Sequence, residues 1–178
     1  MIKDITFNIH SIVQNSDIYG PGTRWVLWVQ GCTLGCKGCW NEETWEHGIG
    51  EIVTLEELKS SIQEAGNIEG ITILGGEPLQ QKIPVLNLIK YVKTIGLTVM
   101  LYTGHQKKEF DDIMWECYNS SDLVISGRYV QSKRDLGLVW RGSTNQVLES
   151  PSNYYDVEHY EENQEVEKMK VIENIMKV

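Results

Sequence analysis

Three cysteines within eight residues constrain this chain more than any other feature of its sequence. Cys32, Cys36 and Cys39 form a C-x3-C-x2-C run, in which Gly35 and Gly38 let the backbone turn tightly around a compact centre. Soft thiolate ligands select zinc, Cu(I) or iron–sulfur clusters. A structural zinc site usually draws a fourth ligand from a second cysteine pair, and the sequence has no such pair. The run therefore favours an iron–sulfur cluster with three protein ligands and one iron left open.

The fourth cysteine, Cys117, lies far along the chain, in a segment over residues 107–118 that fits a helix. A buried free cysteine is common in folded proteins. We interpret Cys117 as a core residue rather than as a fourth ligand.

The composition is that of an ordinary globular protein. Of the 178 residues, 41% are hydrophobic and 23% are charged, which excludes a disordered, collagen-like or coiled-coil chain. No apolar run approaches the roughly 18–20 residues that span a bilayer, and the first ten residues lack the order of a signal peptide. We therefore expect a cytoplasmic protein with no membrane partner. In a reducing compartment, cysteines are more often metal ligands or free thiols than disulfides.

The net charge of −9 argues against binding to nucleic-acid phosphates. The charge is uneven, because residues 149–178 hold eight acids against three lysines. Residues 149–163 are polar and are interpreted as a linker, whereas residues 164–178 carry an apolar stripe at helical spacing. We predict a core domain over residues 1–148 and an acidic C-terminal extension over residues 149–178. Removal of the extension is expected to leave cofactor chemistry intact and to weaken coupling to a partner.

Short apolar runs alternate with segments of helical periodicity along the core domain. Thr54 and Glu57 have the spacing of a capping box before one such segment. Alternation of this kind predicts parallel βαβ units and therefore an α/β fold. The predicted strands are 24–30, 70–74, 97–102 and 123–125, the predicted helices are 55–66, 84–96 and 107–118, and residues 128–147 are a loop that becomes extended around 140–148.

Every unusual loop directly follows one of the predicted strands. Ligands of parallel sheets collect at the carboxyl ends of the strands. We therefore expect these loops to lie together at one edge of one sheet. They hold the three cysteines, Gly75-Gly76-Glu77-Pro78, Thr103-Gly104-His105 and Gly127-Arg128.

Five ordered motifs give the sequence a resemblance to a known family. The cysteine run followed by Trp40 is similar to the signature of the radical S-adenosylmethionine enzymes. Within that superfamily the chain most resembles the small activating enzymes of glycyl-radical enzymes, above all those of anaerobic ribonucleotide reductases. The motifs are Gly20-Pro21-Gly22-Thr23-Arg24, residues 29–41, residues 75–79, Tyr102-Thr103-Gly104 and residues 140–146.

The resemblance implies a partial (β/α) barrel of parallel strands, with one 4Fe–4S cluster on the three cysteines and S-adenosylmethionine at the open iron. It implies that Gly75, Gly76, Glu77 and Pro78 form a loop that binds the amino group of the methionine moiety, with Glu77 as support. Read without the resemblance, Glu77 is an ordinary carboxylate at a strand end.

Further cofactor contacts are implied by position. Trp40 and Asn41 follow the third cysteine, and Trp40 could stack on the adenine or could be a core tryptophan. Thr103 and Ser126 stand at strand ends, where each is either a hydrogen-bond donor to the cofactor or a simple strand terminator. Arg128 could pair with the methionine carboxylate, although related enzymes often have lysine around this position. We interpret the neighbouring histidine, at position 105, as solvated.

The implied reaction is one-electron cleavage of S-adenosylmethionine to methionine and a 5′-deoxyadenosyl radical, which takes a hydrogen from a protein partner. The resemblance implies that this partner is a large glycyl-radical protein, namely an anaerobic ribonucleoside-triphosphate reductase, and that the electron donor is a flavodoxin or ferredoxin. Two alternatives stay open. One is a minimal radical enzyme that modifies a ribosomal peptide, of splicease or crosslinking type, with a small partner protein. The other is a non-catalytic iron–sulfur or zinc module, which would not need the loop over residues 75–78.

Overall fold

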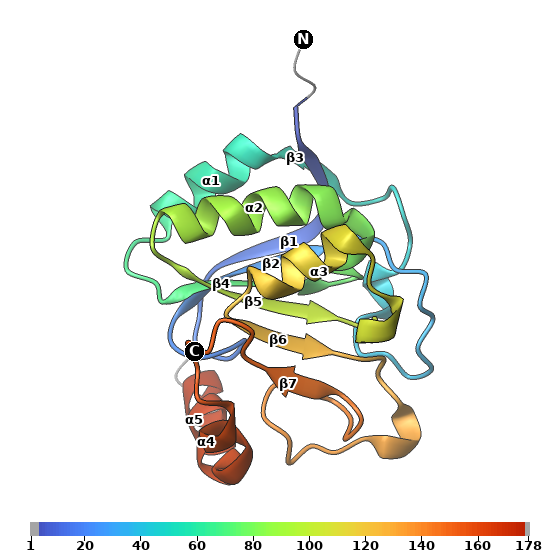
Figure 1. Ribbon diagram of the computed structural model, residues 1–178, viewed down its shortest axis with the longest axis vertical. Helices are drawn as coiled ribbons and strands as arrows, with labels where there is room; N and C mark the ends of the chain where they lie inside the picture. Colours follow the sequence, from blue (N-terminus) through green and yellow to red (C-terminus); the bar gives the residue numbers. More distant parts are fainter. Residues whose placement is uncertain (1–3, 177–178) are drawn as a thin grey trace.

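A computed structural model describes residues 4–176, whose strands join one seven-stranded sheet (Figure 1). The strands are β1 (Thr6–Ser16), β2 (Arg24–Val29), β3 (Glu51–Thr54), β4 (Gly70–Gly75), β5 (Thr98–Thr103), β6 (Leu123–Ser126) and β7 (Val147–Glu149). The helices are α1 (Leu55–Glu64), α2 (Lys82–Thr94), α3 (Asp112–Asn119), α4 (Val157–Glu162) and α5 (Gln164–Ile175). The strand order is β3-β1-β2-β4-β5-β6-β7, so the sheet is open.

The centre of the sheet is parallel and its edges are antiparallel. Strands β2, β4, β5 and β6 run parallel to one another, whereas β1, β3 and β7 pair antiparallel with their neighbours. Helix α2 connects β4 to β5, and α3 connects β5 to β6. These are the βαβ crossovers that the alternating pattern predicts. The prediction of an α/β fold built on parallel strands is therefore confirmed.

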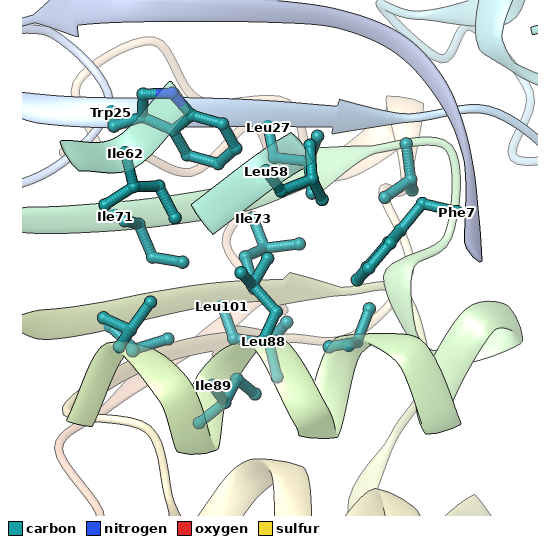
Figure 2. Packing of buried hydrophobic residues seen from close by; sticks show 14 of the residues in the cluster. Phe7, Trp25, Leu27, Leu58, Ile62, Ile71, Ile73, Leu88, Ile89 and Leu101 are labelled. Atoms are coloured by element: carbon teal, nitrogen blue, oxygen red, sulfur yellow. The ribbon is translucent and has the colours of Figure 1, made fainter. Parts of the chain in front are cut away.

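The outer face of the sheet is covered by α1, α2 and α3 (Figure 1). Alternate residues of β2 and β4, among them Trp25, Leu27, Ile71 and Ile73, are fully buried in a cluster that includes Leu58 of α1 (Figure 2). Alternation arises because successive side chains of a strand point to opposite faces. Helix α1 begins with the predicted capping box, in which Thr54 and Glu57 each satisfy the other's backbone N–H.

The opposite, inner face carries a second and smaller cluster. Its fully buried members are Met100, Leu123, Ile125 and Leu148. Partly buried residues from the last part of the chain pack against them, namely Trp140, Tyr155, Val157 and Tyr160, together with Tyr102 of β5. We call this set the inner-face cluster. In Figure 1, α4 and α5 accordingly lie apart from α1, α2 and α3.

Two predicted helix starts were wrong. Helix α2 begins at Lys82, two residues before Pro84, because proline is tolerated in the first turn of a helix. Residues 107–109 form a separate 3-10 turn, and α3 begins at Asp112. Asp111 caps α3 by accepting a 3.0 Å hydrogen bond from the Met114 N–H.

The interpretation of residues 149–163 as a linker was also wrong. This segment contains the end of β7 and the whole of α4, and Tyr155 packs on the inner face of the sheet. The expected helix in residues 164–178 is present as α5, and residues 177–178 lie outside the described residues. A boundary between residues 148 and 149 would cut β7, and the division into two domains stays a prediction.

Strands β1 and β3 were not predicted, and the expected extended stretch around 140–148 is confined to β7. Trp140 instead has a left-handed backbone, with φ of 57°. Within residues 4–176, no helix combines the length and the apolar character needed to cross a bilayer.

Candidate functional site

A cavity of about 490 Å³ lies at the carboxyl ends of the parallel strands and extends over the inner face. It is lined by Cys32, Cys36 and Cys39, by the loop over residues 75–78, and by the loops after β5 and β6. Trp28, Leu74 and Tyr102 line it from the sheet itself. The structure thus brings together the loops that follow the strands, as expected for ligand sites of parallel sheets.

The cysteine loop is fixed at both ends by backbone hydrogen bonds. The Gly31 N–H donates to the Thr44 carbonyl at 2.7 Å, and the Cys32 N–H donates to the Trp45 carbonyl at 3.0 Å. A tight turn then joins the other two cysteines, since the Cys39 N–H donates to the Cys36 carbonyl at 3.1 Å. The loop that carries the thiols is therefore held independently of any ligand.

The three thiols are partly exposed on the cavity wall and are not joined in disulfides. Burial raises the pKa of Cys32 and of Cys36 above the ordinary thiol value. A soft metal centre would have to displace these protons, because thiolate is the form that binds metal. Among the described residues, no group of three His, Cys, Asp or Glu side chains is positioned around a single metal ion. The donor set, three thiols in one loop, fits a cluster of several iron atoms.

Cys117 lies outside this cavity. It is fully buried in α3, and its thiol is 3.6 Å from the Lys82 carbonyl. Burial raises its pKa to about 12, so the thiolate is strongly disfavoured. These properties agree with the interpretation of Cys117 as a core residue.

The loop over residues 75–78 lies directly against the start of the cysteine loop. The Gly76 N–H donates to the Val29 carbonyl at 2.8 Å, and the Glu77 N–H donates to the Gly31 carbonyl at 2.9 Å. A Cβ atom on Gly76 would lie 2.4 Å from the Gly31 carbonyl oxygen. The absence of a side chain at Gly76 therefore serves close approach to Gly31, and binding of the methionine amino group by this loop stays a prediction.

Glu77 joins the loop after β4 to the loop after β5. Its side chain is buried and accepts hydrogen bonds from the Leu79 N–H at 2.9 Å, the Thr103 hydroxyl at 2.8 Å and the Gly104 N–H at 2.7 Å. Burial raises the pKa of Glu77, and the three donors oppose that shift. These contacts account for the supporting role that the sequence suggested for Glu77. The Thr103 hydroxyl donates its hydrogen bond to Glu77, and a contact of Thr103 with the cofactor stays a prediction.

Trp40 stands on the rim of the cavity and is 54% exposed, so the alternative of a core tryptophan is wrong. Its ring centroid is 5.9 Å from that of Tyr129, and the Arg134 guanidinium lies 5.7 Å from the centroid. Asn41 lines the cavity beside it. Stacking of Trp40 on an adenine stays a prediction.

Ser126 and Arg128 do not line the cavity. Ser126 is buried at the end of β6. Arg128 forms a two-pronged ion pair with Glu109, with nitrogen–oxygen distances of 2.6 and 2.8 Å. Their cofactor roles stay predictions. The interpretation of His105 as solvated was wrong, because both ring nitrogens are buried and have no hydrogen-bond partner among the described residues.

Two glutamines that follow the predicted motif were missed. The Gln80 side chain donates to the Thr33 hydroxyl at 2.6 Å and accepts from the Thr33 N–H at 3.2 Å. The Gln81 amide donates to the carbonyls of Asn8 and Gln30 at 2.7 and 3.0 Å. Gln80 thus fixes the cysteine loop itself, and Gln81 fixes the residue that precedes Gly31 against β1. Only the position of the two glutamines directly after the 75–79 motif could have indicated these contacts.

Comparison with known proteins gives consistent matches. A family model described as a 4Fe-4S single cluster domain matches residues 18–149. A Vibrio cholerae protein named anaerobic ribonucleoside-triphosphate reductase-activating protein is 34% identical over 149 residues, which cover 79% of this chain and 96% of that protein. Proteins of the same name from Escherichia coli K12 and enterobacteria phage T4 are 31% and 36% identical, covering 79% and 74% of this chain and 97% and 86% of their own lengths. Among solved structures, QueE from Escherichia coli matches with a TM-score of 0.48 and 16% identity, over 66% of this chain and 68% of that chain.

Proposed function

We propose a specific activity for this chain, which belongs to the family of the anaerobic ribonucleoside-triphosphate reductase-activating proteins and matches a 4Fe-4S single cluster domain over residues 18–149. The activity is reductive cleavage of S-adenosylmethionine, followed by transfer of a hydrogen atom from a backbone glycine of an anaerobic ribonucleoside-triphosphate reductase. The observation that carries the proposal is the single cavity shared by Cys32, Cys36, Cys39 and the loop over residues 75–78. The relatives' names favour a reductase over a ribosomal peptide as the partner.

The cluster, when bound, supplies the electron that splits S-adenosylmethionine into methionine and a 5′-deoxyadenosyl radical. Three thiolates on the cysteine loop would hold it, and three protein ligands leave one iron for the cofactor. The Glu77 N–H donates to the Gly31 carbonyl at 2.9 Å, and this bond joins the loop over residues 75–78 to the start of the cysteine loop. The two binding elements are therefore fixed relative to each other. Preorganisation of this kind reduces the entropy that must be lost when the cofactor binds.

The cavity walls would orient the cofactor and limit access of water and oxygen to a reactive intermediate. Tyr19 and Trp28 form an edge-to-face pair with ring centroids 5.3 Å apart on this wall. Trp40 and Tyr129 form the rim. Hydrogen abstraction would turn the radical into 5′-deoxyadenosine and leave the unpaired electron on the partner's glycine. A flavodoxin or ferredoxin would supply the electron.

The test uses the full chain, reconstituted anaerobically with iron and sulfide. We expect about one 4Fe–4S cluster per chain, release of 5′-deoxyadenosine on reduction with S-adenosylmethionine, and a glycyl-radical EPR signal when the reductase is added. Cys36→Ala should abolish all three, and the matched variant Cys117→Ala should retain them. A stable cluster in Cys36→Ala, or zinc as the sole bound metal, would refute the metal assignment. Cleavage without any radical on the reductase would refute the partner assignment.

A further inference from the structure

The C-terminal extension is hydrogen-bonded to the inner face of the sheet through Tyr155. The Tyr155 hydroxyl lies 2.9 Å from the Thr98 hydroxyl and 3.0 Å from a Glu69 carboxylate oxygen. It also lies 3.4 Å from the guanidinium of Arg24, which is fully buried. A buried cation requires hydrogen-bond partners, and Tyr155 supplies one of them. The extension is therefore attached to the domain that carries the cavity.

Helix α4 contacts two consecutive residues of the loop before β7. The Tyr160 ring packs edge-to-face on Trp140, with centroids 5.0 Å apart. Glu161 binds Arg141 through both oxygens, at 2.7 and 2.8 Å. Two-pronged pairing fixes the orientation of a guanidinium as well as its position. The Arg141 side chain is 7% exposed and the Glu161 side chain is 38% exposed, so the guanidinium is buried while its carboxylate partner is partly open to water.

Both residues held by α4 line the cavity. Trp140 has φ of 57°, a conformation that is strained for a bulky side chain and that persists only when surrounding contacts impose it. The indole N–H of Trp140 and the Nε–H of Arg141 are buried and have no acceptor among the described residues. Buried donors in native proteins usually have partners. These two donors suit a bound molecule that brings acceptor oxygens, such as a carboxylate or a carbonyl group.

We propose that the C-terminal extension helps to build the cavity wall. Through Tyr160 and Glu161, α4 holds Trp140 and Arg141, which act as positioning residues in that wall. The match to the 4Fe-4S single cluster domain ends at residue 149, so these contacts come from a segment outside that domain. The extension thereby sets the shape of a wall that the cofactor or substrate contacts.

The first test is hydrogen exchange measured by mass spectrometry on the full chain, in peptides covering residues 136–146. Glu161→Ala removes both contacts to Arg141 and should speed exchange there roughly tenfold, the size expected for loss of a charged hydrogen bond. The matched control is Glu162→Ala, because Glu162 is the next residue of the same helix and Arg141 pairs with Glu161 instead. Equal exchange in the two variants would overturn the proposal. If the alanine variant does not fold, Glu161→Gln should change exchange in the same direction.

The second test is equilibrium binding of S-adenosylmethionine to the reconstituted protein, and this step rests on the proposed function. Glu161→Ala should weaken binding several-fold, with cluster content and the Glu162→Ala control unchanged. Faster exchange with unchanged affinity would overturn the positioning role. Absence of binding by the parent protein would instead refute the proposed function, and the exchange measurement alone would then decide whether α4 holds the wall.

Discussion

Replacing Gly76 by alanine is expected to separate the two loops that build the site. An added Cβ would lie 2.4 Å from the Gly31 carbonyl oxygen and 2.9 Å from its carbonyl carbon, whereas ordinary contact begins at 3.4 Å. The neighbour is backbone and cannot rotate away, so the loops must move apart by about 1 Å. Overpacking of this kind typically costs about 1–3 kcal/mol of stability.

The displacement would reach the cluster ligands, because Gly31 immediately precedes Cys32 and accepts the Glu77 N–H. A shift of about 1 Å in a positioned group can lower activity about 100-fold. We expect Gly76→Ala to retain less iron and sulfide after anaerobic reconstitution and to unfold at a lower temperature, by roughly 2–4 °C for each kcal/mol lost.

The matched control is Gly137→Ala, where the new Cβ meets the Asp135 carboxylate, 3.0 Å from its oxygen and 3.9 Å from its carbon. A side chain can shift by the few tenths of an ångström that this contact requires, so the control should keep its iron content and its unfolding temperature. Equal iron content and equal unfolding temperature in Gly76→Ala and the parent protein would refute the reasoning from backbone contact.

Three further outcomes follow from single contacts. In the folded protein, iodoacetamide at pH 8 should spare Cys117, whose pKa burial raises to about 12, and should label it in urea; labelling without denaturant would contradict this. Tyr155→Phe removes the hydroxyl that contacts Arg24, Thr98 and Glu69 and should lower the free energy of unfolding by at least about 1 kcal/mol in urea titrations. An unchanged midpoint would exclude that contribution. The Arg128 guanidinium holds the pKa of Glu109 at about 2, below its value of about 4.3 in an unfolded chain. The pair therefore stabilises the fold above that unfolded pKa, and this stabilisation is lost as pH falls toward 2. In Glu109→Gln, the free energy of unfolding should fall less steeply between about pH 4.5 and 2 than in the parent protein. Parallel curves of unfolding free energy against pH for the two proteins would refute the assignment.

The outer half of the fold could be predicted because its signals are local. Leu58 and Ile62 recur at helical spacing after a capping box, and Ile71 and Ile73 alternate within a short strand. Glycines and strand ends then located the loops that line the cavity. These features depend on neighbours a few residues away, which a sequence pattern records.

Strand β1 was missed because its pairing is irregular. The register with β2 shifts between Ile9 and Ser11 and again between Val13 and Ser16. Each shift breaks the alternation of apolar and polar residues that marks a strand, as bulges do. The ion pair between Arg128 and Glu109 could not be predicted from the sequence either, because the two residues become neighbours only in the folded chain.

The contacts of the C-terminal extension could not be predicted from the sequence, and they lead to a different prediction for its removal. From sequence, truncation after Leu148 should spare cofactor chemistry, since all motifs lie earlier. In the fold, that truncation removes Tyr155 from the buried Arg24 and Glu161 from Arg141. Both arginines are buried, and a buried charge that loses a hydrogen-bond partner destabilises the fold. We therefore expect residues 1–148 to unfold at a lower temperature than the full chain and to bind S-adenosylmethionine more weakly after reconstitution. Equal binding and equal unfolding temperature in the two proteins would show that the extension is dispensable for the cavity.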